Sequence, residues 1–211
     1  MARDNILHRV RTALGRSEGQ PINPPPPVRL HVPPMNLESR IHGMLQRVSD
    51  LGGRTCHATS PQDACDFALG VIAGKPAIAS NSPFLVECGI TALPGVHSGI
   101  TDREELRQLC ATSPLGITSA DYALADTGTL VMLASPQEAR MISLLPPKHL
   151  AIVPSSRILS SLDELLTVLP YPAQQTSSMV LITGPSRTAD IEQILIRGVH
   201  GPGELSVVLV G

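Results

Sequence analysis

Apolar side chains recur with helical spacing along much of the chain, and short continuous apolar runs separate these stretches. The clearest helical stripe begins at Leu37, includes Ile41 and Val48, and stops at Gly52 and Gly53, where glycine is typical of a helix end. The same spacing predicts further helices over residues 4–14, 62–73, 103–110, 161–169 and 189–197. Short apolar runs predict strands over residues 54–58, 76–80, 129–134, 150–153, 179–183 and 205–210.

Apolar strands that alternate with helices are typical of α/β proteins, in which a mostly parallel sheet carries helices on both faces. We therefore predict such a domain over residues 37–211. Residues 1–19 are expected to form a helical arm that ends near Gly15, and residues 20–36 a proline-rich linker, because a run of prolines cannot continue a helix. The apolar stripe of the arm must be buried somewhere. We expect it to pack on the body of its own chain, and docking on another subunit of a homo-oligomer is the alternative.

Charge and composition exclude several classes of partner. The chain has 16 Lys and Arg against 18 Asp and Glu, a formal net charge of -2, and 2% aromatic residues. It therefore lacks the basic field and the stacking surface that nucleic-acid binding needs. No apolar run approaches the roughly 18 residues of a membrane helix, and no apolar stretch follows the N-terminal arginines. We expect a soluble, cytoplasmic protein with no membrane span.

The residues that most often bind metals are dispersed along the chain. Cys56, Cys65, Cys88 and Cys110 are widely spaced and form no C-x-x-C pair, and the seven histidines are scattered. We therefore expect reduced thiols and no metal site.

The first segment with candidate chemistry is the sequence Asp126, Thr127 and Gly128, directly before the predicted strand 129–134. Asp126 and Thr127 would present an acid/base or hydrogen-bonding pair at a pocket rim, and Gly128 would let the backbone approach a ligand. The same three residues also form an ordinary turn in many proteins. The sequence leaves both interpretations open.

The second segment begins at Gly184, follows the predicted strand 179–183, and opens the predicted helix 189–197. Loops at the carboxyl ends of parallel strands commonly bind ligands, and the free N–H groups of a helix start favour anions. Arg187 adds a permanent charge and a two-pronged donor that suits a carboxylate or phosphate. The segment therefore predicts an anion site.

A structural role explains the polar residues of this second segment equally well. Ser186 or Thr188 would cap the helix, and Asp190 and Glu192 would suit its first turn. In that case Arg187 pairs with Asp190 or with the carboxylate of residue 126 instead of with a ligand.

The third segment contains His200, which follows the predicted helix. His200 would act as a general acid or base only if its loop folded back toward Arg187. Because loops before and after a helix usually lie on opposite edges of such a sheet, we expect a surface or hydrogen-bonded loop histidine. The same argument applies to His149 at the start of the predicted strand 150–153.

Three segments of the second half together resemble a known family. They are ADYALADTGTLVMLAS (residues 120–135), SLLPPKHLAIVP (residues 143–154) and ITGPSRTADIEQILIRGVHGPGELSVVLV (residues 182–210). This combination resembles the LUD-domain family, from about residue 115 to the C-terminus. The resemblance implies an α/β fold of the NagB/RpiA/CoA-transferase-like type and a role in oxidising L-lactate to pyruvate with iron-sulfur partner proteins. The chain has no ferredoxin-like Cys run, which agrees with a cluster-free component that holds no cofactor itself.

The resemblance also marks a candidate site, which combines the three segments with candidate chemistry described above. Its candidate catalytic residues are Asp126, Arg187 and Asp190, and its candidate ligand-binding residues are Thr127, Gly128, Gly184, Ser186, Thr188, Glu192 and His200, with Gly201 beside them. Our hypothesis is that Arg187 and the helix amides hold a small carboxylate or other anion, which Asp126 and Thr127 face across the sheet edge. Two other functions stay open. One is a stand-alone enzyme of the CoA-transferase or sugar-phosphate isomerase type, and the other is a ligand-binding regulator.

Overall fold

The computed structural model describes residues 2–17, 35–189, 195–197 and 200–211. Most of the predicted linker lies outside these residues. The chain divides into two units, Met1–His31 and Val32–Gly211. The first contains helix α1 (Ala2–Ala13), followed by Gly15 with a φ of +63°. Ile6, Val10 and Leu14 of this unit are exposed, and the burial of the apolar stripe stays a prediction.

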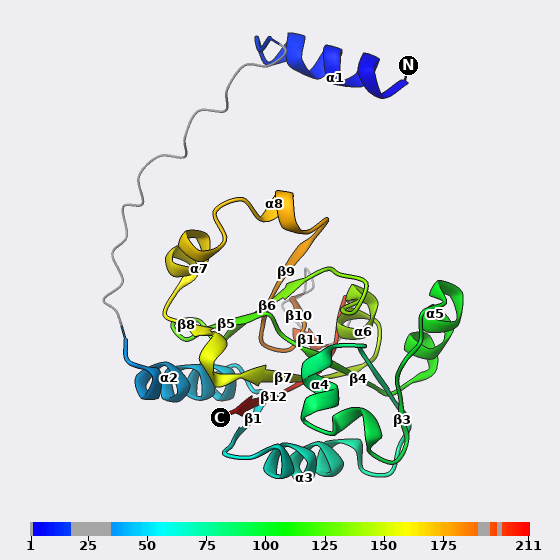
Figure 1. Cartoon of the computed structure of the whole chain (residues 1–211), viewed down its shortest axis with the longest axis vertical. Helices are drawn as coiled ribbons and strands as arrows, with labels where there is room; N and C mark the ends of the chain where they lie inside the picture. The colour runs from blue at the N-terminus through cyan, green and yellow to red at the C-terminus, as the bar shows by residue number, and fades with distance from the viewer. Residues whose placement is uncertain (1, 18–34, 190–194, 198–199) are drawn as a thin grey trace. The chain divides into compact units, whose positions relative to one another are not determined.

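A parallel sheet lies at the centre of the second unit (Figure 1). Within the residues that the structure describes, its six strands have the order β1-β12-β7-β4-β2-β3, and every neighbouring pair is parallel. The strands are β1 (Arg54–Ala58), β2 (Ala77–Ala79), β3 (Val96–His97), β4 (Leu115–Ser119), β7 (Lys148–Pro154) and β12 (Glu204–Val210). The predicted mostly parallel sheet is therefore confirmed.

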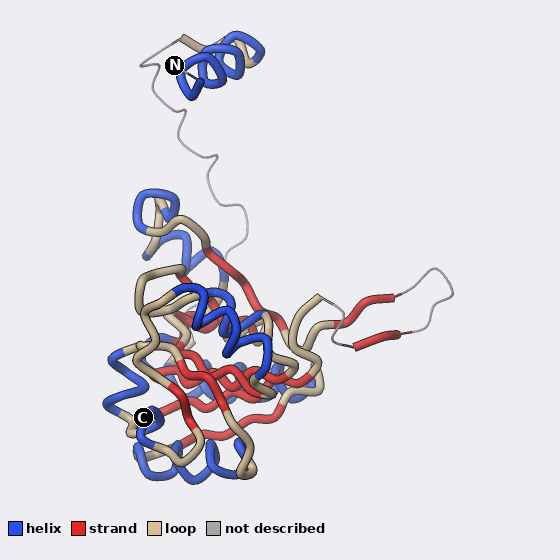
Figure 2. Tube along the Cα trace, turned by 90° about the vertical axis from the view of Figure 1, so that its right-hand side faces the viewer, coloured by secondary structure: helices blue, strands red, loops and turns tan. Residues whose placement is uncertain are grey.

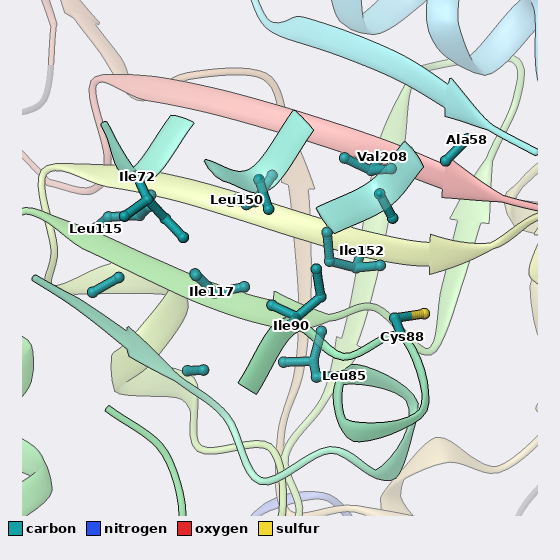
Figure 3. Close-up of a cluster of buried hydrophobic side chains, with 14 residues drawn as sticks. Ala58, Ile72, Leu85, Cys88, Ile90, Leu115, Ile117, Leu150, Ile152 and Val208 are labelled. Carbon is teal, nitrogen blue, oxygen red and sulfur yellow. The ribbon is translucent and has the colours of Figure 1, made fainter. Parts of the chain in front are cut away.

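Helices and a second sheet cover the two faces of this sheet. Leu150 and Ile152 of β7 pack with α3 (Pro61–Ile72) and α4 (Pro83–Glu87) on one face, as Figure 3 shows. The alternate residues Ala151 and Val153 pack with α2 (Leu37–Asp50) on the other. Ile78 contacts α5 (Arg103–Thr112) and α6 (Arg140–Leu144) on that second face. The remaining helical segments are η1 (Ile90–Ala92), η2 (Ser155–Arg157), α7 (Leu162–Val168) and α8 (Pro172–Gln175).

A second sheet of four strands lies beside α2 in the described part of the chain, in the order β8-β5-β6-β9. Its strands are β8 (Ile158–Leu159), β5 (Tyr122–Leu124), β6 (Thr129–Leu133) and β9 (Met179–Thr183), with β6 antiparallel to both β5 and β9. The predicted strands 129–134 and 179–183 therefore exist, but they belong to this mixed sheet. The sequence pattern did not predict a second sheet.

Local signals account for the two best predicted helices. The Asn36 side chain accepts a hydrogen bond of 2.8 Å from the backbone N–H of Ser39 and so caps α2. Ser60 and Asp63 form a reciprocal capping box at the start of α3, with Pro61 in its first turn. These caps satisfy backbone donors that a helix start otherwise leaves unpaired.

The predicted helix over residues 189–197 is wrong. Its described ends are two short antiparallel strands, β10 (Arg187–Ala189) and β11 (Leu195–Arg197), with Arg187 paired to Arg197. Figure 2 shows this pair set apart from the two sheets. The stretch is short, so its helical spacing is a weak signal, and pairing between strands decides the outcome. The helix start that was expected to supply amides to an anion is therefore not formed at Arg187.

Among the described residues, no helix is long and apolar enough to cross a membrane. The same residues contain no group of three or more His, Cys, Asp or Glu side chains that could hold a metal ion. The four cysteines are free thiols.

Candidate functional site

Two predicted site loops pack against the end of α2, and both need glycine there. Gly128 has a φ of +68°, and a Cβ atom on it would lie 2.7 Å from the Cβ of Arg47. Gly184 has a φ of +80°, and its Cβ would lie 3.0 Å from the Cβ of Leu51. Residues with a side chain rarely adopt this left-handed backbone conformation, and neither position has space for a Cβ atom. The two glycines therefore bring both loops to the same end of one helix.

A chain of hydroxyl groups connects the first loop to the second sheet. The hydroxyl of Thr127 lies 3.2 Å from a carboxylate oxygen of Asp126, to which it donates, and 2.8 Å from the hydroxyl of Thr129. Thr129 in turn lies 2.8 Å from the hydroxyl of Thr183, its antiparallel partner. Asp126 and Thr127 are exposed, and this chain of hydroxyls connects them to Thr183 at the end of β9.

The second loop borders a cavity of about 410 Å³. This volume is in the range of small-molecule sites. The predicted residues that line it are Gly184, Ser186, Arg187, His200 and Gly201. Thr183 also lines it, whereas Asp126, Thr127 and Gly128 are not among its lining residues. The structure thus brings the Arg187 and His200 segments together at one cavity, and the Asp126 segment lies beside that cavity.

The position of this cavity differs from the expected one. His149 and Leu205, near the starts of β7 and β12, form part of its wall. The cavity therefore lies at the amino ends of the parallel strands, although the expected site was at carboxyl ends. The reason is that β9, which leads into the Arg187 loop, belongs to the second sheet, where the carboxyl-end rule for parallel sheets does not apply.

Arg187 is exposed and donates a hydrogen bond from its guanidinium to the backbone carbonyl of Leu51. Leu51 is the C-cap residue directly after α2, and a cation is favourable at a helix C-terminus. Among the described ion pairs, none joins Arg187 to Asp126. A guanidinium has five N–H donors, so this contact leaves others for a ligand.

His200 lies on the same cavity as Arg187, and the expectation of opposite edges is wrong. The backbone N–H of Ser186 donates to the carbonyl of Pro202 over 2.8 Å, which ties the start of the segment to its end. Because β10 and β11 pair as antiparallel strands, the chain returns to where it left, whereas a helix would have carried it away. His200 itself is exposed at the cavity wall.

His149 is the lining residue that sequence reasoning set aside. Only 1% of it is exposed, and its Nε2 atom lies 2.7 Å from the hydroxyl of Thr118 on β4. Its Nδ1 atom has no hydrogen-bond partner within the described structure. Burial lowers the pKa of His149 to about 4, so the ring is neutral near pH 7. No local signal distinguishes this histidine from any other at a strand start.

Three predicted residues cannot be placed in the site. Asp190 and Glu192 lie outside the described residues, and Thr188 lies in β10 with its side chain also outside them. Their candidate roles stay predictions.

The fold and cavity define an α/β protein with a parallel sheet, a second mixed sheet against α2, and a ligand-sized cavity between strand starts and the Arg187 loop. The family model of the LUD domain matches residues 42–210. The chain therefore belongs to the LUD domain family, as the three sequence segments indicated.

Known relatives and a solved structure agree with this assignment. The chain is 42% identical over 111 residues to lactate utilization protein C of Exiguobacterium sp., which covers 51% of this chain and 48% of that protein. It is 32% identical over 157 residues to lactate utilization protein C of Halalkalibacterium halodurans, a match that covers 71% of this chain and 68% of that protein. The first match thus spans about half of the relative's length. A DUF162 family protein from Deinococcus radiodurans has a similar fold, with a TM-score of 0.60, 18% identity, and coverage of 84% of this chain and 100% of that chain.

Proposed function

We propose that this LUD-domain chain serves in the use of L-lactate, as the cluster-free component of a system that oxidises L-lactate to pyruvate with iron-sulfur partner proteins. The relatives named lactate utilization protein C support the proposal. The iron-sulfur partners and the oxidation step belong to the proposal alone.

We further propose that the cavity beside Arg187 binds a small carboxylate or another small anion. The observation that carries this proposal is the charge of the lining: Arg187 and two histidines border the cavity, and none of its described lining residues has a carboxylate. A guanidinium suits the two oxygens of a carboxylate. The cavity has room for more than a three-carbon acid, so larger carboxylates belong to the same ligand class.

His149 adds a second polar contact to the same cavity. An unpartnered buried nitrogen is unfavourable unless a ligand or water satisfies it. L-Lactate carries a hydroxyl next to its carboxylate, and pyruvate carries a carbonyl there. The neutral ring of His149 suits either group, because the Thr118 hydroxyl can donate to Nε2 or accept from it, which leaves Nδ1 able to accept or to donate.

Growth tests the role in lactate use. A strain that lacks this gene and has no second copy is supplied with the wild type, Arg187→Ala or Arg103→Ala, and grown on L-lactate or on pyruvate. Arg103 is an exposed arginine at the start of α5 and does not line the Arg187 cavity, so its variant is the matched control. We expect growth on L-lactate only with the wild type and the control. Undiminished growth of the deletion strain on L-lactate would refute the role.

Calorimetry tests the cavity separately. We expect L-lactate or pyruvate to bind the purified wild type, Arg187→Lys to bind more weakly, and Arg187→Ala to lose binding. The melting temperature of Arg187→Ala should fall by only about 2–4 °C, because one exposed hydrogen bond contributes about 1 kcal/mol. A collapse of folding in Arg187→Ala would instead assign the residue to the stability of α2.

A further inference from the structure

A second cavity, of about 270 Å³, lies at the carboxyl ends of β2 and β4. Ser119 ends β4, and the chain leaves β2 through Ser80. Ligands in open parallel sheets commonly bind at this edge. The polar residues that line the cavity are Ser82, Ser119, Asp121, Ser135, Gln137 and Glu138. The Arg187 cavity lies at the opposite ends of the parallel strands, so the two sites are separate.

Glu138 supplies the observation that points to a ligand here. The residue is 8% exposed, and its Oε2 atom accepts a hydrogen bond of 2.8 Å from the hydroxyl of Ser80. Its Oε1 atom is enclosed and has no hydrogen-bond partner among the described residues. The backbone N–H of Glu138 donates to the hydroxyl of Ser135 over 3.0 Å, which fixes the loop. A buried carboxyl oxygen without a partner is unfavourable, and a donor from a ligand would satisfy it.

A second carboxyl group shares the cavity with Glu138. Asp121 accepts a hydrogen bond of 2.7 Å from the backbone N–H of Leu133 and faces the same space. The positive charge of Arg157 on η2 acts to lower the pKa of Asp121. Arg140, two residues after Glu138, donates a hydrogen bond to Ser178. No Lys, Arg or His lines this cavity in the described part of the chain. The lining thus has two acidic groups, serine hydroxyls and an amide, without a cation of its own.

We propose that this cavity binds a small organic cation that presents a primary ammonium group to Glu138 and Asp121. An ammonium has three N–H donors and no acceptor, which matches a lining of carboxyl and hydroxyl oxygens. One donor would satisfy the unpartnered oxygen of Glu138, and the positive charge would offset both acidic groups. A metal ion fits less well, because the described residues contain no group of three metal-binding side chains.

The same arrangement couples binding to protons. Burial, with a contribution from the nearby Asp121, raises the pKa of Glu138 to about 8, and burial also raises the pKa of Asp121. Glu138 therefore holds a proton near pH 7. A bound ammonium favours the ionised carboxylate, so Glu138 releases its proton when the ligand binds, and binding tightens as the pH rises toward 8.

Titration calorimetry of the full chain with ethanolammonium near pH 7 tests the proposal, in two buffers with different ionisation enthalpies. We expect saturable binding with the release of up to about one proton, and no binding of neutral ethylene glycol. Glu138→Gln should weaken binding by about tenfold or more and abolish proton release. Glu105→Gln, an exposed position on α5, should behave as the wild type.

Two further variants keep the test decisive. Asp121→Asn should also weaken binding, and it replaces Glu138→Gln if that variant fails to fold by circular dichroism. Arg187→Ala should bind ethanolammonium normally, which separates this site from the lactate proposal. Absence of binding by the wild type, equal binding by Glu138→Gln, or binding of magnesium chloride in place of ethanolammonium would overturn the proposal.

Discussion

Gly116 in β4 has no room for a side chain, which gives a sharp test of how the sheet is packed. A Cβ atom on Gly116 would lie 1.9 Å from the backbone carbonyl oxygen of Ile142 in α6 and 3.1 Å from Cγ of Pro146. Carbon and oxygen atoms need about 3 Å or more in a close-packed interior. Gly116→Ala therefore has to push α6 away from β4 by about 1 Å. Since the obstacle is backbone, we expect a loss of about 3 kcal/mol in the free energy of unfolding.

The matched control is Gly70→Ala in the last turn of α3. Gly70 is exposed, and a Cβ atom there would meet nothing within 4 Å. Alanine is the better helix former, so this variant should gain about 1 kcal/mol. The same chemical change is thus expected to have opposite signs at the two positions.

Urea unfolding followed by far-ultraviolet circular dichroism measures both effects, because the chain has no Trp and only two Tyr for fluorescence. The midpoint should fall for Gly116→Ala and rise for Gly70→Ala, with similar slopes. Gly116 is also the strand partner of His149, so the first variant should weaken anion binding as well. A midpoint of Gly116→Ala at or above that of the wild type would refute the packing argument.

Two other predictions concern buried groups. The pKa of His149 is about 4 in the folded chain and about 6.5 in the unfolded one, so acidification between these values favours unfolding by up to about 3 kcal/mol. The urea midpoint should therefore fall less for His149→Gln than for the wild type between about pH 7 and pH 4, and an equal fall in both would contradict the burial argument. Burial raises the pKa of Cys88 and Cys110 to about 11, so iodoacetamide should modify the partly exposed Cys56 and Cys65 first in native protein. Equal labelling rates by peptide mass spectrometry would contradict it.

The elements that sequence predicted well are those whose signals are local. The α2 helix has an apolar stripe on one side, a capping Asn36 and a glycine pair after its end. The strands β7 and β12 are apolar over most of their length and are central in the sheet. In each case the pattern of a single segment indicates both the element and its burial.

The second sheet could not be predicted in this way, because it depends on pairs of distant residues. Thr129 meets Thr183 across 54 positions of the chain. The strands β5 and β8 have three and two residues, respectively, too short for any periodic signal. The same limit explains the error at β10 and β11, where pairing between two segments decided the structure.

The candidate sites show how one general rule succeeds or fails with the assignment of strands. The carboxyl-end rule pointed to the loop after β9 because that strand was assigned to the parallel sheet. The Arg187 loop does border a cavity, but the contact between Ser186 and Pro202 and the wall at His149 create it. The rule therefore led to a cavity for a reason that the structure does not support.

Applied to a strand that does belong to the parallel sheet, the same rule leads to Glu138. The predicted strand 76–80 ends at Ser80, and Ser80 is the residue whose hydroxyl bonds to Glu138. In sequence, Glu138 lies between Gln137 and Ala139 in what resembles an exposed polar loop, but in the structure it is buried and accepts a hydrogen bond from Ser80, 58 positions away. The sequence around Glu138 therefore does not indicate its burial, which depends on the end of a distant strand. The order of the strands has to be known before the acidic site can be found.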